Sequence, residues 1–565
     1  MPPASEADST PTVRPLAGKV NAPQPGYGIH GNLHPDHTGT LLTLRLNGEP
    51  VASTGAGRPG YWDNRHAGSG FLFKVQALFD HLGDGDMLTV TAGDTPVPWA
   101  DGNQVHVVAN GRASRAGELL ARIGEGMAFQ KNGQLGLRLD RNETFFAQID
   151  ALFERIRRVV QGAIGAEVFV TYGALLGCIR EGDFIASDDD IDLAYLSRQR
   201  TPEAVRAEFE RVARALIDDG LHVKVGQYAN LIKISADKGS LPIDLFYAWV
   251  DGEGQLDISY GFHGPAMAVG DDGLALVPGR IGRYTLPIPA RHDEMLLQLY
   301  GPAWRVPDQG FSHFDKTRRL STAHALDEAA VLRLYWESFY AHQGQMRPST
   351  FAEFVLPRLQ PPPAGLAGRV LGRRPAPVRV IEFGCGNGRD TLHFARHGHP
   401  VLGVDAAHAA VDAASRHAHA AGLDAARFQV LDLRDAAALD ALLAAEAAAA
   451  GDAEVLVYCR FFLHAIPEDL QQGLLDALCR QLTRGFRFAA EFRTDRDQAL
   501  KKSFGTTHYR RFIDADALVA ALETGRGARR EHFETGFGLS VYAGEDPHLC
   551  RMLLRFPARP AASRG

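Results

Sequence analysis

Asp188, Asp190 and Asp192 recur at alternate positions in IASDDDIDLAYL (185–196), directly before a run of apolar residues. Alternate side chains of an extended strand lie on one face, so we expect these three carboxylates to face the same way. They repel one another unless a cation lies among them, and Mg²⁺ and Mn²⁺ prefer oxygen ligands. Asp244, a single acid in the apolar strand IDLFYAW, is the expected partner, because burying it alone would be costly. The pattern predicts a divalent-cation site; the alternative is a solvated acidic turn before an edge strand.

Glycine and basic residues accompany the aspartates. Gly173 and Gly177 flank the start of a short expected helix after the strand VFVTY, where exposed N–H groups can receive a phosphate. Arg180 and Lys233 are candidate phosphate contacts, although Lys233, in LIKIS, is equally consistent with a strand lysine that faces solvent. A phosphate-facing glycine turn followed by a carboxylate strand is the layout of a nucleotidyltransferase site.

The order of these motifs resembles the LicD and fukutin family of phospho-alcohol transferases. YGALLGCIREGDFIASDDDIDLAYL carries two glycines separated by three residues, then an arginine, then the DxDxD strand. IDLF and LLQLYGPAWRVP (296–307) follow in the order that the family has. The resemblance spans about 145–315. It departs at Ala186 and Ser187, where the family usually has proline and tryptophan, which leaves the shape of the substrate pocket open.

This resemblance implies transfer of a phosphate-linked alcohol from a cytidine diphosphate (CDP) donor to a sugar hydroxyl. Carried over by position, Asp190 and Asp192 would ligate Mg²⁺ or Mn²⁺, and Asp188 and Asp244 would complete or support the site. The metal would neutralise the diphosphate and orient in-line attack.

A second glycine cluster occurs in VRVIEFGCGNG (378–388), where an apolar strand leads into Glu382 and three alternating glycines. Glycines allow the backbone to approach a ligand at the carboxyl end of the first strand of a parallel sheet. The next strand, PVLGVD, ends in Asp405, where a carboxylate can bind ribose hydroxyls, and a third ends near Asp432. The three glycines are Gly384, Gly386 and Gly388.

The second cluster resembles the class I S-adenosylmethionine-dependent methyltransferases over about 335–555. Arg389 breaks the GxGxxG spacing of dinucleotide-binding folds, which disfavours a nicotinamide enzyme. LCRMLLRF suits the final antiparallel strand of such domains, and the helices within 335–355 are expected to cover the cofactor. By position, the methionine end would contact Glu382, Gly384 and Gly386, the ribose would contact Asp405, and the adenine edge would contact Asp432.

The methyl acceptor is indicated by residues after the fourth strand, EVLVYCRFFLHAI, which has no NPPY-like sequence. A hydroxyl acceptor would need a base, for which His464 is the candidate, with Glu491 as a further catalytic candidate. An arginine cluster suits a phosphate or carboxylate acceptor. The alternative is a set of surface arginines around a packed histidine. The candidate acceptor contacts are Arg460, Arg493, His508, Arg510 and Arg511.

Composition narrows the class of protein. A net charge of −7 over 565 residues argues against a protein whose main role is to bind nucleic acid or an anionic membrane. The five cysteines have no paired spacing, which fits a reducing compartment. The first residues lack a signal-peptide pattern, and no apolar run is long enough to span a bilayer. We therefore expect a cytoplasmic protein, with association at the inner face of the membrane left open.

The expected fold class is multidomain α/β, with a small N-terminal β-domain, a nucleotidyltransferase-like mixed α/β domain and a Rossmann-like doubly wound methyltransferase domain. The role and assembly state of the β-domain are not predicted. The expected parts are a disordered tail (1–30), the β-domain (31–130), the LicD-like domain (140–318), a helical connector with methyltransferase N-terminal helices (319–359), a Pro/Gly/Arg linker (360–378) and the methyltransferase domain (379–565).

Together the two resemblances predict a bifunctional enzyme of bacterial surface polysaccharide biosynthesis, acting on an O-antigen or capsule. Its expected partners are a CDP-activated phospho-alcohol and a lipid-linked or soluble glycan, and no nucleic acid. The methyl would go to the phosphate group or the adjacent sugar. Two alternatives remain: a nucleotidyltransferase that makes an activated sugar or modifies a protein or RNA, with a methyltransferase of separate target; or one degenerate domain that serves as a binding module.

Overall fold

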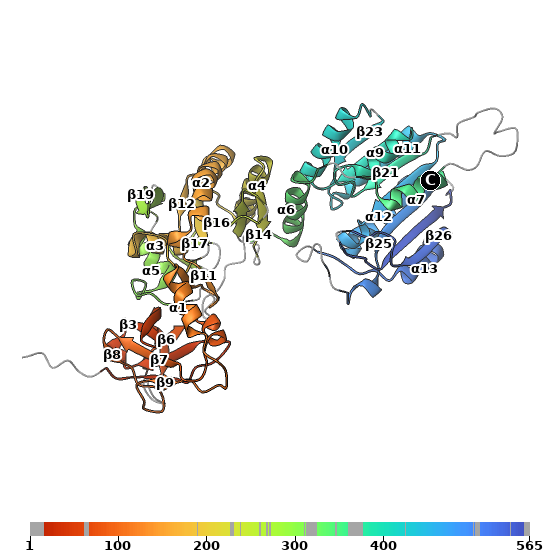
Figure 1. Cartoon of the computed structure of the whole chain (residues 1–565). Coiled ribbons are helices and arrows are strands. Elements are labelled where there is room, and N and C mark those ends of the chain that lie inside the picture. Colours follow the sequence, from red (N-terminus) through yellow and green to blue (C-terminus); the bar gives the residue numbers. More distant parts are fainter. Residues whose placement is uncertain are drawn as a thin grey trace, which may run out of the picture. The chain divides into compact units, whose positions relative to one another are not determined.

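The computed structural model forms two compact units. One contains residues 1–212 and 226–325, and the other contains residues 213–225 and 326–565. The described residues are 16–61, 67–188, 190–226, 231–237, 239–258, 262–266, 269, 273–309, 311, 325–344, 347–359, 377–423, 425–500, 502, 509–542 and 544–558. Figure 1 shows the chain coloured along the sequence, from red at the N-terminus to blue at the C-terminus.

The N-terminal part of the first unit is a β-domain (red to orange in Figure 1). Two sheets have the strand orders β1-β2-β6-β5 and β4-β3-β7-β8, and β9 pairs with β7. Alternating apolar residues of β3 enter the core, as LLTLRL predicts. The strands are β1 Gly18–Val20, β2 Ile29–Leu33, β3 Leu41–Leu46, β4 Glu49–Gly55, β5 Arg58–Tyr61, β6 Ala67–Phe73, β7 Met87–Ala92, β8 Thr95–Pro96 and β9 His106–Val107.

The expectation of a disordered tail over residues 1–30 is wrong for its second half. β1 pairs with β2 in an antiparallel register, and both Val20 and Ile29 are fully buried. This burial stabilises a segment whose proline and glycine content indicated disorder. Residues 1–15 lie outside the described residues.

A helix and a hairpin connect the β-domain to the mixed α/β domain: α1 Ala116–Gly124, then β10 Met127–Phe129 paired with β11 Leu135–Leu137. The amphipathic helix α2 Glu143–Ile164 follows, and it buries apolar residues spaced three and four positions apart. The Asn142 side chain accepts a hydrogen bond from the Phe145 N–H at its start, and Gly165 ends it at φ 67°.

The sheet of this domain has the order β12-β13-β16-β15, and β17 and β18 extend it beyond β16. β13 and β16 are parallel, whereas β12 and β15 run antiparallel to their neighbours. Its elements are β12 Val168–Val170, α3 Tyr172–Arg180, β13 Ile191–Ser197, α4 Pro202–Asp218, β15 Leu231–Ser235, β16 Ile243–Val250, β17 Gln255–Ile258, β18 Phe262–Pro265, β19 Leu276–Ile281, β20 Tyr284–Pro289 and α5 His292–Tyr300. The chain of α4 passes into the second unit after Val212.

The second unit contains the predicted Rossmann-like sheet, in the order β23-β22-β21-β24-β25-β27-β26. β21 to β25 are parallel, and β27 is antiparallel, as LCRMLLRF predicts. The strands of this sheet are β21 Arg379–Phe383, β22 Val401–Asp405, β23 Ala426–Val430, β24 Val455–Arg460, β25 Phe486–Arg493, β26 Arg529–Gly536 and β27 Leu549–Phe556. The unit also contains β14 His222–Val225, which is not part of this sheet. The helices are α6 Glu328–Ala341, α7 Thr350–Leu359, α9 Arg389–Arg396, α10 His408–Ala420, α11 Ala436–Ala450, α12 Glu468–Gln481 and α13 Ala515–Arg526.

The mixed α/β, multidomain character of the fold is thus confirmed. Of the linker predicted at 360–378, residues 360–376 lie outside the described residues. Among the helices that the structure describes, none combines the length and apolar character that crossing a membrane requires.

Candidate active sites

Asp192 and Asp244 lie side by side on the parallel strands β13 and β16, where their Cα atoms are register partners. β15 places Lys233 opposite Asp244, and the Lys233 Nζ lies 2.7 Å from both carboxylate oxygens. Asp188 and Asp190 precede β13, which begins at Ile191. The expectation that all three aspartates share one face of a strand is therefore wrong, because the first two are carried by the loop before it.

Three carboxylates still converge. Asp190, Asp192 and Asp244 each offer an oxygen, and these oxygens lie within 4.8 Å of one another. Burial and neighbouring carboxylates raise the pKa of Asp192 well above its ordinary value, and they raise that of Asp244 to about 6. A cation among the three would relieve this repulsion, and an all-oxygen set suits Mg²⁺ or Mn²⁺. The residues therefore fit the divalent cation expected from sequence.

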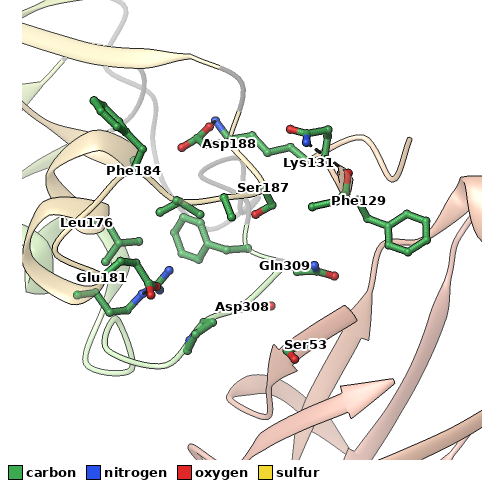
Figure 2. A pocket seen from close by; sticks show the side chains of 18 of the residues that line it. Ser53, Phe129, Lys131, Leu176, Glu181, Phe184, Ser187, Asp188, Asp308 and Gln309 are labelled. Atoms are coloured by element: carbon green, nitrogen blue, oxygen red, sulfur yellow. Dashed lines mark hydrogen bonds and ion pairs between the residues drawn. The ribbon is translucent and has the colours of Figure 1, made fainter. Parts of the chain in front are cut away.

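Lys131 is a site residue that sequence reasoning missed. It lies in the turn between β10 and β11, forms an ion pair with Asp188, and places its Nζ 2.9 Å from the Asp190 Oδ1 (Figure 2). Burial would lower the pKa of Lys131, but the aspartates outweigh burial and raise it, so the ammonium stays charged. Burial raises the pKa of Asp188 to about 7. Burial would also raise the pKa of Asp190, but Lys131, the Asp188 hydrogen bond and the charge of Lys233 together outweigh it and lower the pKa.

The two predicted glycines have different roles. The Gly173 N–H donates to the Asp192 Oδ2 at 2.8 Å, and a Cβ at Gly173 would lie 2.5 Å from the Asp188 Oδ2. Glycine is therefore required where α3 meets the carboxylates. A Cβ at Gly177 would instead lie 2.6 Å from the Asp183 carbonyl oxygen, so Gly177 allows α3 to pack against the following loop. Gly177 is not among the described residues that line the adjoining cavity.

The cavity beside the aspartates has a volume of 1010 Å³ and is lined by both domains of the first unit. Arg180 lines it with its side chain 12% exposed, and forms an ion pair with Glu181 at 2.7 Å. Lys233, the other predicted phosphate contact, is partly exposed and forms an ion pair with Asp244. Figure 2 shows Leu176, Phe184 and Ser187 of the mixed α/β domain on one side of the cavity, and Ser53 and Phe129 of the β-domain side on the other. Aromatic lining comes from Tyr172, Phe246, Tyr300, Trp304 and Phe311.

In the second unit, the predicted glycine turn follows β21. Gly384, Gly386 and Gly388 have φ values of 73°, 52° and 79°, in the left-handed region that favours glycine. The Asp405 Oδ2 accepts a hydrogen bond from the Gly386 N–H at 2.9 Å, and the Glu382 Oε2 accepts one from the Thr391 hydroxyl at 2.5 Å. Burial raises the pKa of both Glu382 and Asp405.

A cavity of 380 Å³ lies over this turn. Glu382, Gly384, Gly386, Asp405 and Asp432 all line it. Gly388 is not among the described lining residues; a Cβ there would lie 2.8 Å from the Ala414 Cβ. Arg434 and Arg333 hold the Asp432 carboxylate, Arg434 through its Nε at 3.0 Å. Of the helices expected to cover the cofactor, α6 lines the cavity with Trp336, Phe339 and Tyr340, whereas no residue of α7 is among the described lining residues.

Four predicted acceptor-site residues line the same cavity: Arg460, His464, Arg493 and Arg510. The His464 Nδ1 accepts a hydrogen bond from the Arg493 backbone N–H at 3.2 Å. A neutral ring in this geometry carries its proton on Nε2, which makes Nε2 a donor. A donor at Nε2 differs from the general-base role that the sequence indicated for His464, and that role stays a prediction. His508 lies outside the described residues.

Two further predicted residues hold the site together from outside the cavity. Glu491 is fully buried between Arg460, at 3.2 Å, and Arg551, at 2.6 Å. Burial raises the pKa of Glu491, and both arginines oppose that shift. Arg511 donates to the carbonyl oxygens of Leu463 and Ile466. Neither Glu491 nor Arg511 is among the described lining residues, so both position other groups.

Arg493 is engaged by acids within the protein. Its guanidinium lies 2.7 Å from the Asp497 Oδ2 and 2.5 Å from the Glu545 Oε1. Burial, followed by the charge of Arg493, lowers the pKa of Arg510. Arg389, which follows the glycine turn, also lines the cavity and could have been proposed from that position.

Two family models match separate parts of the chain. Residues 165–264 match the model described as LicD/FKTN/FKRP, nucleotidyltransferase domain. Residues 380–485 match the model of a methyltransferase domain. No curated protein matches the chain.

Solved structures similar to this chain include three methyltransferases. A SAM-dependent methyltransferase from Methanosarcina mazei is 15% identical over 34% of this chain and 98% of its own, with a TM-score of 0.26. One from Anabaena variabilis is 18% identical over 41% of this chain and 96% of its own, with a TM-score of 0.30. Magnesium protoporphyrin IX methyltransferase from Synechocystis PCC 6803 with bound SAH is 18% identical over 41% of this chain and 100% of its own, with a TM-score of 0.28.

Proposed function

We propose that this chain, which joins a LicD-type nucleotidyltransferase domain to a S-adenosylmethionine-dependent methyltransferase domain, is a bifunctional transferase of bacterial surface polysaccharide biosynthesis. The first domain transfers a phospho-alcohol from a CDP-activated donor to a glycan. The second methylates the transferred phosphate group or the adjacent sugar. The methyltransferase match supports S-adenosylmethionine as its cofactor.

The observation that carries the first activity is the convergence of Asp190, Asp192 and Asp244 inside the matched region. A divalent cation bound there would supply charge neutralisation for the diphosphate. Arg180 lines the cavity and offers donors to a phosphate oxygen. Asp188 lies outside the triad and lines the cavity, and is our candidate to accept the proton of the acceptor hydroxyl.

The proposed reaction is an in-line displacement. The acceptor oxygen forms a bond to the phosphorus that carries the alcohol, and the bond from that phosphorus to the bridging oxygen breaks. Cytidine monophosphate leaves with the bonding electrons, and the hydroxyl proton passes to Asp188. Gly173 and Lys233 keep Asp192 and Asp244 in place through the hydrogen bonds described above.

For the second activity, the cavity arginines favour an anionic acceptor. Arg460 is held by Glu491, and His464 offers an N–H group at Nε2. A phosphate oxygen needs orientation and no base, whereas a hydroxyl would need a base that His464 does not supply in this geometry. The arrangement thus supports the transferred phosphate group as the methyl acceptor.

The test combines the purified protein with Mn²⁺, S-adenosylmethionine, a panel of CDP alcohols and defined oligosaccharides. Phosphorus NMR should show a new phosphodiester and then its methylated form. Asp192→Asn should lose phosphodiester formation by about a thousandfold, because the metal supplies several kcal/mol. Asp405→Ala should lose methylation alone. A nucleotide-linked product, in place of released cytidine monophosphate, would contradict the proposed transfer.

A further inference from the structure

The β-domain is built into the wall of the transferase cavity. The Gln309 N–H donates to the Thr54 hydroxyl of β4 at 3.3 Å, and the Gly55 N–H donates to the Pro307 carbonyl. A Cβ at Gly55 would lie 2.1 Å from the Val306 Cγ1, so β4 packs directly on the segment after α5. The β-domain side chains beside this contact are therefore held facing the cavity.

Two of those side chains are cations. Lys74, directly after β6, and Arg58, at the start of β5, both line the cavity. The Arg58 Nε lies 3.5 Å from the Asp308 Oδ2. Within the described part of the chain, Lys74 makes no hydrogen bond or ion pair, although it is only partly exposed. Asp308 is thus paired with Arg58, whereas the Lys74 ammonium has no described acid paired with it.

Burial is the largest influence on Lys74 and lowers its pKa; Arg58 adds to this, and Asp308 opposes it. A partly buried ammonium without an acceptor has lost hydration that no protein group replaces. An anionic oxygen of a ligand in the cavity would replace the lost hydrogen bonds to water. Lys74 is therefore arranged to receive a charged ligand group.

We propose that Lys74 and Arg58 form an anion subsite for a phosphate or carboxylate group on the glycan acceptor. This inference rests on the proposed function, because it assigns the donor diphosphate to the aspartate site. Figure 2 shows Asp308, the partner of Arg58, separated across the cavity from Asp188. An anion held beside Asp308 is consequently a second one, carried by the acceptor.

The test is calorimetric titration of the full chain, without divalent cation and at constant ionic strength. The probes are glucose 1-phosphate, glucuronate and neutral glucose. We expect at least one charged sugar to bind more tightly than glucose, and the one that does so identifies the group as phosphate or carboxylate. In Lys74→Gln its Kd should rise about tenfold or more, because a charge-assisted hydrogen bond is lost. Lys19→Gln removes the same charge from an exposed position in β1 and should leave the Kd unchanged.

Equal affinity in Lys74→Gln and the unsubstituted chain would overturn the subsite, as would equal binding of charged and neutral sugars. Unfolding temperatures of both variants establish that the fold is kept. Mn²⁺ binding, measured in parallel by electron paramagnetic resonance, separates this inference from the proposed function. Its absence would count against the aspartate site, whereas the sugar titration reports on Lys74 without metal.

Discussion

At the scale of single residues, the side-chain charges around Asp190, Asp192 and Asp244 sum to a value that one divalent cation would balance. Four carboxylates gather there, and two ammonium groups, those of Lys131 and Lys233, pair with them. Two negative charges are left when all six groups are ionised, which is the charge that Mg²⁺ or Mn²⁺ would balance. The two lysines differ in origin, because Lys233 lies in the same sheet as its partner, whereas Lys131 comes from a separate hairpin.

We predict that Lys131→Ala tightens Mn²⁺ binding. Its ammonium lies against Asp188 and Asp190 and competes for the negative charge that would attract the metal. Removing one such cation should lower the Kd for Mn²⁺ about tenfold, which corresponds to ~1.4 kcal/mol. Electron paramagnetic resonance of free Mn²⁺ measures this, and the exposed Lys19→Ala is the control. Weaker binding in Lys131→Ala would mean that Lys131 assembles the site and does not compete for it.

Glu491 gives a second prediction at this scale. Because its buried carboxylate is paired with Arg460 and Arg551, Glu491→Gln leaves two buried guanidinium groups without their counter-charge. The unfolding free energy of the second unit should fall by about 3–5 kcal/mol. Thermal unfolding monitored by calorimetry checks this. If stability is unchanged and methylation disappears, Glu491 acts in catalysis, as the sequence first indicated, and not through Arg460.

These residues show what the sequence could and could not predict. Asp192 and Asp244 were predictable, because each is an acid in an otherwise apolar strand, and such an acid needs a partner. Lys131 was not, since it is 59 positions from Asp190 and belongs to no local pattern. Glu491 was predicted to be catalytic, and Arg511 was predicted to contact the acceptor. Their sequence neighbourhood is the same as that of the cavity residues, and only tertiary packing separates them.

At the scale of elements, Asp86 ties the start of β7 to the β3–β4 turn. Its Oδ1 accepts hydrogen bonds from the Asn47 side chain at 2.9 Å and the Ser114 hydroxyl at 2.8 Å. Its Oδ2 accepts one from the Gly83 N–H at 2.8 Å. Asn47 has a φ of 51°, as an Asn-Gly hairpin turn requires. One buried carboxylate therefore fixes three chain segments of the β-domain.

Asp86 also makes the stability of the β-domain depend on pH. Burial raises its pKa, but the three hydrogen bonds outweigh burial and hold it below the ordinary value of 3.8. A lowered folded-state pKa contributes stability above 3.8, and this contribution is lost as the pH falls through the folded value. Asp86→Ala should cost about 2–3 kcal/mol at neutral pH.

Urea unfolding of the unsubstituted chain and of Asp86→Ala, followed from neutral to acidic pH, measures this dependence. The difference between them should shrink only at acidic pH. A difference that stays constant throughout would show that the network does not depend on the charged form of Asp86.

At the scale of the whole molecule, the compact units do not follow the domain boundaries that the sequence predicts. Residues 213–225 precede much of the first unit's sheet in the chain, but they belong to the second unit. The Val223 N–H donates to the Ser338 hydroxyl of α6 at 3.2 Å, and the rings of His222 and His342 stack at 3.5 Å. No local motif marks these contacts, because they join segments more than a hundred residues apart.

This organisation leads to a prediction about α6. Its residues Trp336, Phe339 and Tyr340 line the methyltransferase cavity, while its Glu337 carboxylate accepts hydrogen bonds from the N–H groups of His408 and Ala409, at 2.8 and 2.7 Å. A fragment of residues 326–565 keeps α6 but lacks residues 213–225, which pack against it. We expect α6 to be docked in only a fraction of the molecules, so that the apparent Kd for S-adenosylhomocysteine equals the intrinsic Kd divided by that fraction.

Calorimetric titration of S-adenosylhomocysteine into the fragment and the full chain measures the loss. If α6 is docked in one molecule in ten, the apparent Kd rises about tenfold. His222→Ala in the full chain is the matched variant, because it removes one stacking contact and leaves every cavity residue in place. The Kd of His222→Ala should lie between the Kd of the full chain and that of the fragment. An identical Kd in the fragment and the full chain would mean that residues 379–565 and α6 hold the cavity without help from residues 213–225, as the sequence-based boundaries implied.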